Sequence, residues 1–107
     1  MNWKEAEEIA CSFLKKKGYK ILQRNYRTRY GEIDVVALYR GTVVFIEVKS
    51  GSSSVDPLDR IDSRKVRSIV LSALCYMKEK GETRPVRVDF VRVLPNSIEH
   101  IEGVWLG

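Results

Sequence analysis

Residues 31–49 constrain the fold most, because they contain two runs of apolar, mostly β-branched residues separated by Arg40-Gly41. β-Branched residues favour strands, and an X-Gly pair between two short strands is typical of a hairpin. A turn at Arg40-Gly41 pairs Tyr39 with Thr42. This register fixes which residues of the two strands stand opposite each other.

The register brings acidic side chains together inside the hairpin. Asp34 is expected opposite Glu47, and Glu32 opposite Lys49. Because side chains alternate between the two faces of a strand, all four are predicted on one face. Like charges placed directly opposite each other destabilise a sheet. A divalent cation between the acids would remove the repulsion, since Mg²⁺ prefers oxygen ligands. The alternative is an edge hairpin whose charges point into solvent.

Both faces of the hairpin also carry apolar residues. The acidic face is predicted to include Val36, Leu38, Val43 and Phe45, and the other face Ile33, Val35, Val44, Ile46 and Val48. Strands that are apolar on both faces are typical of the centre of a sheet. We therefore favour a functional role for the acids over a solvated edge.

Length and composition narrow the class of protein. The 107 residues predict one domain, residues 1–107, around a single core. No apolar run approaches the ~20 residues of a membrane helix, and residues 1–8 do not resemble a signal peptide. We expect a cytoplasmic protein with no membrane partner. The single His100 and the isolated Cys11 and Cys75 argue against zinc and against a Cys–His or Ser–His nucleophile. Both cysteines are expected in or near the core.

Positive charge gathers in one segment of a chain whose net charge is +5. Between Ile9 and Gly31 there is no acid, and the basic residues are Lys15, Lys16, Lys17, Lys20, Arg24, Arg27 and Arg29. Such a block is typical of a polyanion-binding surface, and it would follow a nucleic-acid backbone without reading bases. The alternative is a solvated face that keeps the chain soluble.

The residues before the hairpin predict an amphipathic helix from Trp3 to about Lys17, ended by Gly18. The apolar stripe consists of Trp3, Ala6, Ala10, Phe13 and Leu14. Glu7 lies at the flank of the stripe and could reach inward, whereas Glu8 is expected in solvent.

A second helix is predicted to begin at a cap on Asp62 or Ser63, to reach about Lys80 and to end at Gly81. Its apolar stripe consists of Val66, Ile69, Val70, Ala73, Leu74 and Met77. Lys65 lies off the centre of this stripe, so it points either toward the hairpin acids or into water. The Ser/Gly-rich residues 50–61 are either a loop that gates the site or a plain connector.

Further strands are predicted over residues 19–27, 85–94 and 98–105, the last of them at an edge with Ile101 and Trp105 on one face. The order is helix, three strands, helix, two strands. A crossover from the third strand through a helix gives an α/β fold, in which a mixed five-stranded sheet has helices on both faces.

The acids and the lysine form a chemically sensible set for phosphodiester hydrolysis. Asp34 and Glu47 would hold one or two Mg²⁺ or Mn²⁺ ions, which lower the pKa of a bound water and stabilise charge on the phosphate. Lys49 shares their face. It would orient or deprotonate that water, or clamp the phosphate.

The segments 31–37 and 44–49, with Gly-Glu-Ile-Asp and Glu-Val-Lys, resemble the PD-(D/E)XK nuclease core. Together with Glu7 and Ala10, Lys17-Gly18-Tyr19 and residues 24–27, they make about residues 3–105 similar to the YraN family of bacterial proteins, relatives of archaeal Holliday-junction resolvases. The resemblance implies a restriction-endonuclease-like fold.

The resemblance also implies roles for individual residues. Asp34 and Glu47 match the metal-binding carboxylates, Glu7 an additional metal-site acid, and Lys49 the catalytic lysine. Glu32 and Lys65 match recurrent positions near the site, and Lys65 is grouped with the nucleic-acid-binding residues. The chain departs from the family at Gly51, where an Arg is frequent, so no phosphate contact is expected there. The resolvase relatives are homodimers, which makes a two-fold dimer plausible.

The sequence thus predicts a Mg²⁺-dependent endonuclease that acts on DNA, including branched DNA. One alternative is a nucleic-acid-binding module that keeps the fold without the chemistry. Another is an adaptor whose basic face binds an acidic protein.

Overall fold

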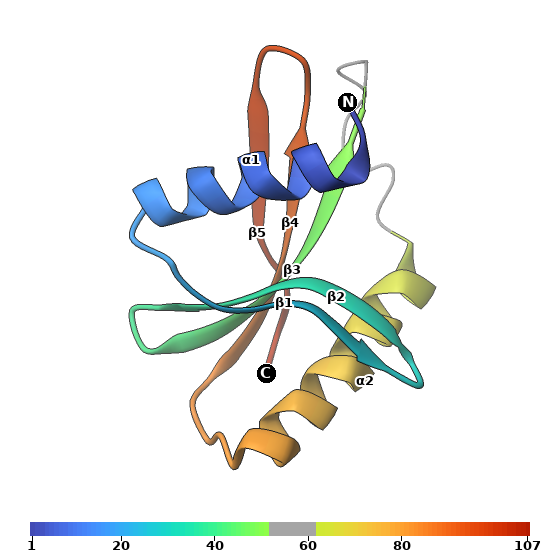
Figure 1. The fold of residues 1–107 in the computed structure, drawn as a ribbon. Helices are drawn as coiled ribbons and strands as arrows, with labels where there is room; N and C mark the ends of the chain where they lie inside the picture. The colour runs from blue at the N-terminus through green and yellow to red at the C-terminus, as the bar shows by residue number, and fades with distance from the viewer. Residues whose placement is uncertain (52–61) are drawn as a thin grey trace.

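The computed structural model describes residues 1–51 and 62–107, in which one helix packs against each face of a five-stranded sheet (Figure 1). The elements are α1 (Trp3–Lys16), β1 (Lys20–Thr28), β2 (Gly31–Tyr39), β3 (Thr42–Ser50), α2 (Ser63–Lys80), β4 (Val86–Val93) and β5 (Ile98–Leu106). This order confirms the predicted α/β architecture, and each element begins and ends close to its expected residues. The expected gating loop or connector lies largely outside the described residues.

The strands stand in the sheet in chain order, β1-β2-β3-β4-β5. The β3–β4 pair is parallel and the other pairs are antiparallel, because the chain crosses from β3 to β4 through α2. The predicted central position of the hairpin is confirmed, as is the edge position of the last strand. Within the described ranges, no helix has the length and apolar character needed to cross a membrane.

The predicted register of the β2–β3 hairpin is confirmed from Tyr39–Thr42 to Val35–Ile46. Arg40 and Gly41 both have positive φ, 48° and 80°. Positive φ at both central residues gives a two-residue turn whose twist suits the flanking strands. The backbone pairing ends at Val35–Ile46, immediately before the two acids.

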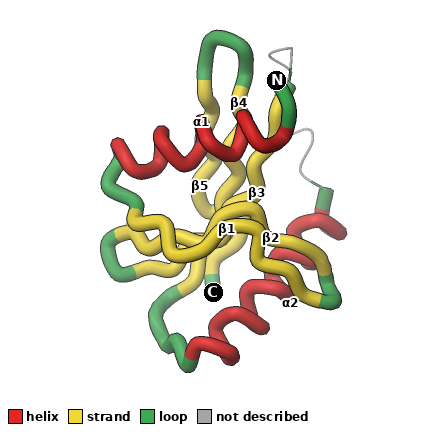
Figure 2. Tube along the Cα trace, in the orientation of Figure 1, coloured by secondary structure: helices red, strands yellow, loops and turns green. Residues whose placement is uncertain are grey.

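The two helices lie on opposite faces of the sheet (Figure 2), and each covers an apolar core of its own. The core on the α1 side consists of Ala6, Ala10 and Leu14 of the helix with Val35, Ala37, Val44 and Ile46 of the sheet. The core on the α2 side consists of Ile69, Ala73, Tyr76 and Met77 of the helix with Ile33, Val36 and Phe45 of the sheet. Two predicted members of the apolar stripes are wrong. Trp3 is 61% exposed and Leu74 is 52% exposed. On α2 the buried face turns toward Ser72 and Tyr76, which leaves Leu74 on the solvent side.

The helix ends follow from capping residues. The Asp62 side chain accepts a hydrogen bond from the Arg64 N–H at 2.8 Å, so Asp62 rather than Ser63 caps α2. Gly81 ends that helix in the left-handed region at φ 62°, which costs glycine little. Cys11 is buried and Cys75 part-exposed, as expected for residues in or near the core.

A buried polar network ties β4 to β5 on the α1 side. The Arg87 guanidinium donates to both carboxylate oxygens of Asp89 at 2.8 Å. His100 Nε2 lies 2.7 Å from Asp89 Oδ2, and the Gly103 N–H donates to Oδ1 at 2.9 Å. Burial opposes ionisation of Asp89, but these hydrogen bonds outweigh it and lower the pKa of the carboxyl. His100, the only histidine, therefore has a structural setting.

Candidate metal centre

Glu7 projects from the inner flank of α1 toward the sheet, and its side chain is almost fully buried. Asn25 Nδ2 donates to both of its oxygens, at 3.0 and 3.3 Å. Arg24 lies 3.5 Å from the same carboxylate. The prediction that Glu7 reaches inward is confirmed, and Glu8 is exposed as expected, where it pairs with Arg24 at 2.8 Å.

The backbone of β1 and β2 changes phase beside Glu7. Asn25 lies between the paired positions Arg24–Val35 and Tyr26–Ile33, opposite Asp34, and it has a positive φ of 53°. Ile33 then packs on the α2 side while Val35 packs on the α1 side. Strict alternation would place Ile33 and Val35 on the same face.

This phase change overturns the predicted single acidic face. Glu32 turns toward the α1 side, where it accepts from Asn25 at 3.0 Å and from Arg27 at 2.9 Å. It was expected opposite Lys49. Glu47 instead approaches α2, since Lys65 Nζ lies 3.2 Å from its carboxylate. The prediction failed because alternation assumes a regular strand on both sides of Asp34.

Asp34 stands where β2 parts from β3 and joins the two acidic groups. Its Oδ2 accepts a hydrogen bond from the Val48 N–H at 2.8 Å. This side-chain bond links β2 to β3 beyond the last backbone pair, Val35–Ile46. Burial raises the pKa of Asp34 to about 8. A hydrogen bond with Glu47 and the charges of Glu47 and Glu7 act in the same direction, whereas the Val48 N–H opposes them.

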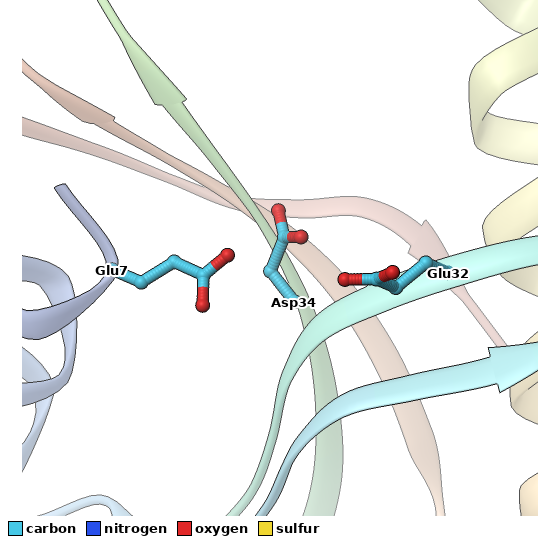
Figure 3. Close-up of side chains that lie close together, drawn as sticks. All are labelled: Glu7, Glu32 and Asp34. Atoms are coloured by element: carbon cyan, nitrogen blue, oxygen red, sulfur yellow. The ribbon is translucent and has the colours of Figure 1, made fainter. Parts of the chain in front are cut away.

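Three carboxylates converge at this point (Figure 3). One oxygen each from Glu7, Glu32 and Asp34 lies within 4.8 Å of the others. Figure 3 shows Glu7 reaching in from α1 while Glu32 and Asp34 approach from β2. Among the described residues this is the one group of three acids, cysteines or histidines so arranged. The group contains Glu7 and Asp34 of the expected ligands together with Glu32, while Glu47, the third expected ligand, is hydrogen-bonded to Asp34.

Glu47 is buried beside the three acids, and its carboxylate pairs with two lysines. Lys65 lies 3.2 Å from its Oε2 and Lys49 4.0 Å. Of the two orientations left open for Lys65, the structure shows the one toward the hairpin acids. Lys49 is about half-exposed, at 47% of its side-chain surface. Lys49 therefore faces solvent beside the acids, while the ion pair with Lys65 links Glu47 to α2.

Most residues of the basic block divide between the acids and the far end of α1. Arg24 and Arg27 lie at the acids, paired with Glu7, Glu8 and Glu32. Arg29 stacks on Tyr30. The remaining members, Lys15, Lys16, Lys17 and Lys20, are exposed near the far end of α1. The rise of a helix puts Lys15 about 12 Å along the axis from Glu7.

Two residues, Asn25 and Arg92, were not assigned to the site or its surroundings from the sequence. Asn25 orients Glu7 and Glu32, and its signal is that Asn is among the few residue types that adopt a left-handed backbone readily. Arg92 of β4 places its guanidinium 3.0 Å from where a Cβ on Gly51 would stand. The guanidinium of Arg92, in β4, thus lies beside Gly51, the position at which the resemblance led us to expect an Arg.

The fold and the acids define a class: a small α/β protein with a partly buried carboxylate cluster between its first helix and its sheet. Residues 6–93 match the profile of the Uncharacterised protein family UPF0102. A UPF0102 protein of Thermotoga petrophila is 64% identical over 107 residues, covering 100% of this chain and 99% of that protein. One of Thermotoga neapolitana is 62% identical over the full length of both chains. One of Persephonella marina is 40% identical over 105 residues, covering 95% of this chain and 90% of that protein. The chain belongs to the UPF0102 family, which confirms the resemblance to YraN-like proteins.

Proposed function

We propose that this protein is a metal-dependent endonuclease that hydrolyses phosphodiester bonds in DNA. The observation that carries the proposal is the convergence within 4.8 Å of the buried Glu7 with the half-buried Glu32 and Asp34. Buried carboxylates that face one another are unfavourable without a cation. The PD-(D/E)XK-like pattern of the two strands supports the same conclusion.

The donor set fits a hard divalent cation. Three carboxylates and no sulfur or imidazole suit Mg²⁺ or Mn²⁺, which bind oxygen and keep some of their waters. The raised pKa of Asp34 supports this choice, because burial and the neighbouring acids disfavour its charged form in the absence of a cation. Asn25 fixes two of the acids from behind, as outer hydrogen bonds do in metal sites.

The remaining side chains have separable roles in this proposal. Bound metal would supply an activated water and stabilise charge on the scissile phosphate. Glu7, Glu32 and Asp34 would hold the metal, and Glu47 would link Asp34 to the lysines. Lys49 is the exposed cation that would meet the phosphate or orient the water. Arg27, whose side chain is 82% exposed, would contact the backbone of the nucleic acid.

The test is a cleavage panel of linear and branched DNA with Mg²⁺ or Mn²⁺. Native protein is expected to cut. Glu47→Ala should lose about 10- to 100-fold in rate, the range for residues behind metal ligands, and Asp34→Asn, which alters a proposed ligand, should lose at least as much. Glu5→Gln is the control, because Glu5 is an exposed acid on α1, the helix that carries Glu7. Equal cutting by Glu47→Ala and native protein would sink the proposal. A panel that includes paired cuts at junctions also tests the proposed two-fold dimer.

A non-catalytic DNA-binding module is the second candidate. Arg24 and Arg27 already pair with Glu7 and Glu32, so part of the acidic charge is balanced without metal. Salt-dependent DNA binding with no cutting under any metal would favour this candidate.

A further inference from the structure

Trp3 is the first residue of α1, and 61% of its surface is exposed. Tryptophan offers the largest apolar ring of any side chain, and exposing it to water forgoes the free energy of burial. The helix does not require this exposure, since the neighbouring stripe residues Ala6 and Ala10 are buried. An exposed indole of this kind is typical of a contact surface.

The indole lies at the carboxylate cluster. Trp3 lines a hollow of about 320 Å³ together with Glu7, Asp34 and Arg27. It also lines an adjoining hollow of about 430 Å³, which Glu7, Arg24 and Asn25 share. Figure 1 shows that the start of α1 lies beside the distal end of β3, whose residues Val48 and Ser50 complete the first hollow.

The chemistry of the first hollow separates into three parts. Acids line it, Arg27 extends into solvent, and the aromatic ring of Trp3 borders it. Proteins that hold single strands combine cations for the backbone with aromatic rings on which bases stack. In a regular duplex the faces of each base are covered by its neighbours. An indole beside the phosphate site can therefore stack only on a base that has left the helix or was never paired.

We propose that Trp3 stacks on an unpaired nucleobase next to the bound phosphate, so that the site takes DNA with unpaired nucleotides rather than uniform duplex. This inference rests on the proposed function and names the substrate class of the same site. A flap, a single strand or the open centre of a branch supplies such a base. Trp3 acts as a positioning residue, since it touches the base and not the reacting phosphate.

Binding separates this inference from cleavage. The affinity of full-length protein is measured in Ca²⁺ for a labelled single strand of about 12 nucleotides and for the corresponding duplex. Trp3→Ala should bind the single strand about 5- to 150-fold more weakly, the range for loss of one base–aromatic stack, and leave duplex binding unchanged. Trp3→Phe keeps a ring and should stay close to native. Leu74→Ala, which alters another exposed apolar residue, on α2, is the control and should change neither affinity.

Fluorescence gives a second readout. Stacking quenches an indole, so the single strand should quench native protein. Trp3→Phe leaves Trp105 as the only tryptophan and should abolish the quenching while binding persists.

Several results would overturn the inference: equal losses for single strand and duplex in Trp3→Ala, unchanged binding, quenching that survives in Trp3→Phe, or no binding of either DNA. A change in oligomeric state on Trp3→Ala, without a change in DNA preference, would assign the ring to a second copy of the chain and also overturn it.

Cleavage in Mg²⁺ distinguishes the two proposals. Trp3-dependent binding of single strands without cutting contradicts the nuclease and leaves the base contact standing. Cutting that ignores Trp3 and shows no preference for unpaired DNA contradicts the base contact alone.

Discussion

Replacing Asp34 by Asn should remove a pH dependence from the stability of the metal-free protein. The pKa of this carboxyl is about 8 in the folded chain and 3.8 as an ordinary value. Between those values the unfolded chain is ionised while the folded chain holds the proton. Stability therefore falls as pH rises through this window and levels off above pH 8, by up to about 1.4 kcal/mol per pH unit.

The magnitude between pH 6 and pH 8 follows from these two pKa values. In the unfolded state Asp34 is ionised across these two pH units, whereas in the folded state it begins to ionise only near pH 8. The free energy of unfolding should drop by about 2 kcal/mol through Asp34. For a chain of this length that corresponds to roughly 9 °C in melting temperature.

Urea denaturation in EDTA at pH 6 and pH 8 measures the effect. Other groups that titrate in this interval contribute to both proteins, so the difference between native protein and Asp34→Asn isolates the carboxyl. Adding Mg²⁺ at pH 8 should restore stability in native protein and not in the variant, because metal binds the folded state and competes with the proton. Identical losses for native protein and Asp34→Asn would refute the assignment of the raised pKa. No stabilisation of native protein by millimolar metal would refute the metal site.

Two substitutions test the frame around the site. Asp89→Asn should cost about 3 kcal/mol in unfolding free energy, since it leaves the part-buried Arg87 guanidinium without its charged partner, and unchanged denaturation curves would contradict this. Gly31→Ala should cost about 1–3 kcal/mol, because Gly31 has φ 141° and a Cβ would stand 2.5 Å from Ser68 Oγ. A Gly31 variant as stable as native protein in thermal melts would show that α2 yields at Ser68.

The sequence predicted the elements well because their signals are local. Alternating and helical apolar patterns located every strand and helix, Gly81 located the end of α2, and Arg40-Gly41 fixed the register of the hairpin through the geometry of a two-residue turn. Membership of the UPF0102 family was likewise visible in the pattern of Gly-Glu-Ile-Asp and Glu-Val-Lys. The roles of Asp34, Glu47 and Lys49 in catalysis stay predictions.

For residues 31–49, the sequence by itself determined a central hairpin in which Asp34 stands opposite Glu47, whereas the end of the backbone pairing at Val35–Ile46 was visible only in the structure. Only the tertiary structure decided which way the acids turn. A positive φ at Asn25 on the neighbouring strand lies opposite the phase change at Asp34, so Glu32 joins Glu7 instead of facing Lys49. Alternation is a property of one regular strand, whereas this irregularity involves two strands and a helix. The same holds for Trp3, whose helical position implied burial, but whose ring at the first residue of α1 is 61% exposed.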